Sequence, residues 1–78
     1  MSLDSIFSGA LLREGHKAVK AAFPAINLRK DAWVYCFGRD HWEFHGPDDY
    51  YWHGSASNAA DARYKGWMAY LRSKGVEV

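Results

Sequence analysis

The stretch AWVYCFGRDHWEFHGPDDYYWH, residues 32–53, decides the fold of this chain. It contains most of the Trp, Tyr and Phe residues and three of the four histidines. In two segments a bulky aromatic residue stands at every second position, which is the period that a β-strand requires. The alternation predicts strands over residues 32–37 and 41–46. A third strand over residues 50–53 would be short, so the pattern supports two or three strands.

The faces of these strands follow from the turn at Gly38 and Arg39. A loop of two or of four residues sets the aromatic residues of both strands on one face, which we expect to be the core face. The expected core consists of Trp33, Tyr35, Trp42 and Phe44 from the strands, with Tyr64, Trp67 and Leu71 from the last helix. The expected solvent face carries His41, Glu43, His45, Ala32, Val34 and Cys36.

Helical periodicity flanks the aromatic stretch on both sides. Apolar residues at spacings of three and four predict helices over residues 4–23 and 57–74. Pro24 ends the first helix, and Gly75 provides a stop for the second. The sequence therefore predicts one α+β domain over residues 1–78, with the order α-β-β-(β)-α and both helices on one face of an antiparallel sheet.

Composition limits the classes of function. With a formal net charge of +1, no overall field draws the chain to nucleic acid or to an anionic membrane. The single cysteine, Cys36, excludes an internal disulfide and suits a reducing compartment. The sequence has no apolar run of about 20 residues, and it does not start like a secretory leader. We expect a cytoplasmic protein.

The polar residues of the second strand form an H-x-E-x-H pattern. On a strand, His41 and His45 lie about 13 Å apart, too far to share one zinc ion. A two-residue loop could bring Cys36, His41 and Glu43 together, but no donors for an oxyanion are apparent. No nucleotide or phosphate motif is present. We expect no metal site, no cofactor and no enzymatic activity.

The last helix has two stripes. A bulky stripe is expected to lie on the sheet: Ala60, Tyr64, Trp67, Met68 and Leu71. A second stripe of small residues would allow a partner helix to approach. The sequence therefore favours a non-catalytic protein-binding module, such as an adaptor, an inhibitor or a homo-oligomeric accessory protein, that contacts another protein or a second copy of itself. Its expected contact residues are Ala62, Gly66, Ala69, Tyr70 and Ser73.

The alternative function is nucleic-acid binding through exposed aromatic residues flanked by basic ones. Its candidate residues are Arg39, Tyr50, Tyr51, Trp52 and Arg63. The order of elements also matches double-stranded-RNA-binding domains, but those need clustered Lys and Arg at the start of the last helix. Here that segment reads SASNAADAR, with one acid and one base. The salt dependence of binding would separate the two functions.

Overall fold

The computed structural model describes residues 3–77, with side chains from Phe7 to Glu77. The predicted α+β class is confirmed, and all three strands are present. The elements are α1 (Leu3–Ala22), β1 (Trp33–Cys36), β2 (His41–His45), the 3-10 turn η1 (Pro47–Asp49), β3 (Tyr51–Ser55) and α2 (Ala59–Ser73). No helix within residues 3–77 combines the length and the apolar character needed to cross a membrane.

The sheet is antiparallel throughout, in the order β1-β2-β3. Phe37 N–H donates to His41 O, so three residues form the loop, 38–40. An odd loop sets Val34 opposite Phe44 and shifts β1 by one residue relative to the expected pairing. Because side chains alternate between faces, this shift moves every side chain of β1 to the other face.

Two predicted core residues are therefore on the wrong face. Trp33 and Tyr35 are 53% and 54% exposed, whereas Phe44 of β2 has no exposed surface. Val34 takes their place beside Phe44 and packs against the core. The buried core consists of Val19, Ile26, Ala32, Phe44, Trp67, Met68, Tyr70 and Leu71.

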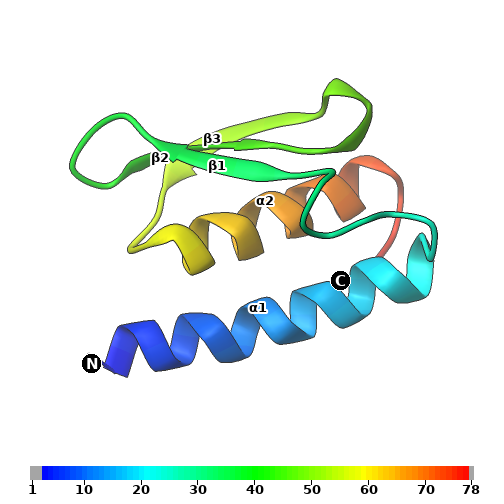
Figure 1. The fold of residues 1–78 in the computed structure, drawn as a ribbon, viewed down its shortest axis with the longest axis horizontal. Helices are drawn as coiled ribbons and strands as arrows, with labels where there is room; N and C mark the ends of the chain where they lie inside the picture. The colour runs from blue at the N-terminus through cyan, green and yellow to red at the C-terminus, as the bar shows by residue number, and fades with distance from the viewer. Residues whose placement is uncertain (1–2, 78) are drawn as a thin grey trace.

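Figure 1 shows the sheet, α2 and α1 stacked in that order. Both helices lie on one side of the sheet, as predicted, but α2 contacts all three strands whereas α1 packs chiefly on α2. This stacking explains why α2 carries two apolar stripes: it has a layer on each side. The opposite face of the sheet has no helix over it within the described residues.

Each stripe of α2 is only in part where it was expected: Trp67 of the bulky stripe packs on Phe44 of the sheet, but other residues do not follow the prediction. Gly66, in the stripe of small residues, lies against the Phe44 ring so closely that a Cβ would overlap it. Tyr64 and Met68, in the bulky stripe, reach Gly15 of α1, where an added Cβ would lie 3.2 Å and 3.4 Å from them. The prediction that the bulky stripe lies on the sheet is wrong for these two residues. At position 66 the Phe44 ring leaves room only for a glycine.

The ends of α2 are fixed by local hydrogen bonds. Asn58 is the N-cap, and its side chain accepts from Asp61 N–H at 2.9 Å. Asp61 Oδ2 accepts in turn from Ser57 N–H at 2.9 Å and pairs with Lys65 at 3.1 Å. The predicted stop is confirmed, because Gly75 has φ +80, a conformation that favours glycine. These contacts anchor the helix against which the sheet packs.

Candidate functional site

Exposed aromatic side chains gather on the face of the sheet that the helices leave uncovered. Trp33, Tyr35, Phe37 and Tyr51 are each 45–54% exposed. Among the described side chains, only one other large apolar residue is comparably exposed, Phe7 of α1. Scattered exposed apolar residues are normal, but a continuous aromatic surface marks a binding site.

We call this surface the open sheet face. It is formed by alternate residues of the three strands and by the residue after β1. Its members are Trp33, Tyr35, Phe37, His41, Glu43, His45, Tyr51, His53 and Ser55.

The aromatic rings of this face are ordered by contacts with one another. The Trp33 and His45 rings stack with centroids 3.8 Å apart and planes within 3°. Tyr51 meets His45 edge to face at 5.2 Å. Phe37 packs against His41 at 4.5 Å. Rings that are already packed lose little freedom when a partner covers them, which favours binding.

Glu43 lies at the centre of the open sheet face. Its Oε1 accepts a hydrogen bond from His45 Nε2 at 3.0 Å, and its Oε2 accepts from Tyr51 O–H at 2.8 Å. A carboxylate can only accept, so the imidazole must be the donor. The bonds from His45 and then Tyr51 lower the pKa of Glu43, and the bond to Glu43 raises the pKa of Tyr51. The face therefore carries a fixed negative charge near neutral pH.

Two further histidines meet beside this network. His41 Nε2 on β2 lies 3.4 Å from His53 Nδ1 on β3, and both side chains are exposed. The imidazole nearest to His41 is therefore that of His53 on the adjacent strand, and the distance from His41 to His45 along β2 does not limit this contact. Among the side chains described, those of residues 7–77, no three His, Cys, Asp or Glu form a metal-binding group.

The predicted approach of Cys36 to His41 and Glu43 is wrong. Cys36 pairs with Trp42 in the register, so it lies on the helix side of the sheet while His41 and Glu43 lie on the other. Its thiol donates to Gly38 O at 2.8 Å. The odd loop that moves the aromatic residues outward also separates this thiol from the imidazole.

The stripe expected to bind a protein is largely inside the fold. Ala62 has no exposed surface, Tyr70 is 2% exposed and Gly66 is covered by Phe44. Ala69 is half-buried and Ser73 is exposed. The prediction that these residues form an open surface is thus wrong for three of the five, because Ala62, Gly66 and Tyr70 are buried within the fold.

The five residues predicted for nucleic-acid binding do not form one surface. Tyr51 is on the open sheet face, whereas Trp52 points to the helix side and is half-buried. Tyr50 packs edge to face on Tyr70 at 5.4 Å. Arg39 is in the exposed loop after β1, and Arg63 is on α2.

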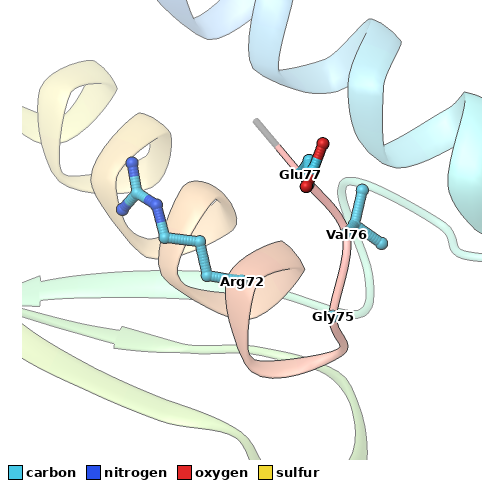
Figure 2. A pocket seen from close by; sticks show the side chains of 4 residues that line it. All are labelled: Arg72, Gly75, Val76 and Glu77. Atoms are coloured by element: carbon cyan, nitrogen blue, oxygen red, sulfur yellow. The ribbon is translucent and has the colours of Figure 1, made fainter.

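Hollows at two places lie away from the open sheet face, and one of them has Phe23, Ile26 and Tyr70 in its lining. Figure 2 shows the one at the carboxyl end of α2, lined by Arg72, Gly75, Val76 and Glu77. The side chains of Arg72 and Glu77 point away from one another there. This hollow is shallow and open, and its lining lacks the aromatic residues that anchor a ligand.

No known protein family, curated protein or solved structure matches this chain. The residues of the open sheet face therefore carry the functional argument. Sequence reasoning missed Trp33, Tyr35, Phe37 and His53 as site residues. The length of the loop could have revealed the first three. With three residues between the strands, Trp33, Tyr35 and Phe37 lie on the face of the sheet that does not carry Phe44.

Proposed function

We propose that the protein is a non-catalytic binding module of the cytoplasm that docks a protein partner on its open sheet face. The observation that carries the proposal is the gathering of four half-exposed aromatic residues on one uncovered face. Large aromatic side chains are enriched at the centres of protein interfaces and account for much of their binding energy.

Charge supports a partner that presents a basic side chain within an apolar surface. The three strands, WVYC, HWEFH and YWHGS, contain no Lys or Arg. Their exposed rings have negative faces, and Glu43 adds a carboxylate among them. An Arg or Lys of the partner would complement that charge.

A second copy of the chain suits this surface less well. In a symmetric dimer the same patch meets itself, so the Glu43 carboxylates at its centre would approach one another. Nucleic acid suits it less well too, because phosphates are held by Lys and Arg and the strands have none. We therefore favour a different protein as the partner.

The test is capture of partners from the native host extract with wild type, the double variant Trp33→Ala/Tyr35→Ala and the control Phe7→Ala. Both variants should remain folded, because every residue that they replace is exposed. We expect a protein captured by wild type and by Phe7→Ala but lost with the double variant. Treatment with nuclease, and a rise in salt from about 50 to 200 mM, should leave the capture largely intact. A complex between two proteins has no phosphate contacts to lose, and such contacts cause the steep salt dependence of nucleic-acid binding.

Three results would overturn the proposal. Capture that disappears with nuclease or steeply with salt would assign the face to nucleic acid. Capture that survives the double variant but is lost with Ala69→Glu would return the site to α2. A wild-type chain that sediments as a dimer, and a double variant that sediments as a monomer, would make the partner a second copy.

A further inference from the structure

We propose that His41 and His53 form a two-ligand site for a zinc-type divalent ion on the open sheet face. The site is independent of the docking function, because it needs only the two imidazoles and the ion. Imidazole nitrogen is a preferred ligand of Zn²⁺, Ni²⁺ and Cu²⁺.

The distance between the two nitrogens fits a tetrahedral ion. Zinc–nitrogen bonds are 2.0–2.1 Å long, so two ligands at the tetrahedral angle lie about 3.3–3.4 Å apart. Without an ion, His41 Nε2 and His53 Nδ1 are 3.4 Å apart in a hydrogen-bond contact, and an ion bound by both nitrogens would replace the proton between them. At the right angle of a square-planar ion the same bonds would place them about 2.9 Å apart, so the observed separation is closer to the tetrahedral arrangement. Water fills the two remaining positions.

Neighbouring residues hold both rings in place. The Phe37 ring packs against His41 at 4.5 Å, and the Tyr51 ring lies 5.7 Å from His53. The two histidines come from adjacent, hydrogen-bonded strands, so their backbones are fixed by the sheet. Little ordering is needed when the ion binds.

Negative charge on both sides favours a cation. Glu43 is the register partner of His53, so the two side chains are direct neighbours on the same face of the sheet. On the other side, Asp40 Oδ2 accepts from Ser55 O–H at 3.0 Å, and Ser55 is the register partner of His41. Neither carboxylate needs to bind the ion to attract it.

The test is titration of the purified chain with zinc chloride near neutral pH, followed by calorimetry for stoichiometry and by NMR for the histidine rings. We expect one ion per chain and shifted resonances of His41 and His53. Each of His41→Ala and His53→Ala should weaken binding by roughly tenfold or more, since even outer-shell changes cost 10–100-fold. Cobalt substitution should give the visible absorption of a four-coordinate site.

His45→Ala is the matched control. It removes an imidazole from the same strand and face, but one that is bonded to Glu43 rather than to His53. Its zinc affinity should equal that of wild type. Three results would each overturn the assignment: no saturable binding by wild type, binding unchanged in His41→Ala and His53→Ala, or an equal loss in His45→Ala. All three histidines replaced are at least partly exposed, so a melting curve suffices to show that the variants fold.

Discussion

Phe44 and Phe37 belong to opposite faces of the same sheet. Phe44 has no exposed surface and meets Trp67 edge to face at 5.1 Å, whereas Phe37 keeps 47% of its surface in water. The inner ring is covered by α2, where Gly66 allows close approach. The outer ring has only its neighbours on the sheet, Tyr35 and His41.

The difference shows how one small sheet can serve folding and binding separately. Burial of an aromatic side chain stabilises the fold in proportion to the apolar area removed from water. The inner face gains that stabilisation in the isolated chain. The outer face still exposes its aromatic area, so the same gain is available when a partner covers it. Substitutions should therefore separate the two faces cleanly.

The largest expected effect is that of Phe44→Ala. Removing a buried Phe costs about 3–5 kcal/mol, which is a large part of the roughly 5–15 kcal/mol that stabilises a domain. Phe37→Ala, the same change on the open face, should cost less than about 1 kcal/mol, as exposed substitutions do. Urea unfolding of both variants measures the difference. Equal losses of stability would mean that the open face is also part of the core.

The second prediction concerns the approach of α2 to the inner face. In Gly66→Ala the new methyl would overlap the Phe44 ring, and overpacking of this kind costs about 1–3 kcal/mol. The control is Gly9→Ala in α1, where nothing lies within 4 Å of the new methyl. Helix propensity alone should stabilise that variant by up to about 1 kcal/mol. Opposite signs in thermal melting confirm the close contact, and stabilisation by both changes contradicts it.

The sequence predicts one face of this sheet well and the other poorly, for a physical reason. Periodicity correctly predicts both helices and the first two strands, and it correctly assigns Phe44, Trp67 and Leu71 to the core; it left the third strand open. Those assignments depend on spacing within one element. Which residues of β1 share a face with Phe44 depends instead on whether the loop is odd or even, and composition does not determine that number.

The prediction of the functional site also depended on the number of residues in the loop between β1 and β2. With Trp33 and Tyr35 assigned to the core, only Tyr50, Tyr51 and Trp52 remained as exposed aromatic candidates beside the sheet, and α2 became the favoured site. The His41–His53 pair was missed for a related reason, because it joins two strands and its distance cannot be obtained from spacing along one. Pairing across strands is information that a single sequence carries only weakly.

A third, smaller effect is expected at Trp33. Its ring stacks on His45 but is half-exposed, so Trp33→Ala should lose little more than the stacking contribution, about 0.5–1.5 kcal/mol. Trp67→Ala in α2 is the control on the inner side and should cost about 3–5 kcal/mol, because Trp67 has no exposed surface. Both values come from denaturant titration. A Trp33→Ala variant as unstable as Trp67→Ala would show that the stacked ring supports the fold.

The smallest expected effect is a change in pH dependence at Glu43. Hydrogen bonds from His45 and Tyr51 hold the pKa of Glu43 below its ordinary value of 4.5. A carboxyl whose pKa is lower in the folded than in the unfolded chain stabilises the fold above the unfolded pKa. That stabilisation is lost as pH falls through 4.5 and then through the lower, folded pKa. The Glu43→Gln variant lacks the titrating group, so its stability should fall less steeply over this acidic range.

Urea midpoints measured from about pH 3 to pH 7 test this prediction. Glu77→Gln, a change at an exposed glutamate near the carboxyl end, is the control and should follow the wild-type curve. Tyr51→Phe removes one of the two bonds to Glu43 and should give an intermediate slope. If Glu43→Gln also follows the wild-type curve, the hydrogen bonds of Glu43 do not persist in water. The carboxylate would then be free of His45 and Tyr51 in the unbound chain, and its orientation toward a partner's basic side chain would have to form on binding.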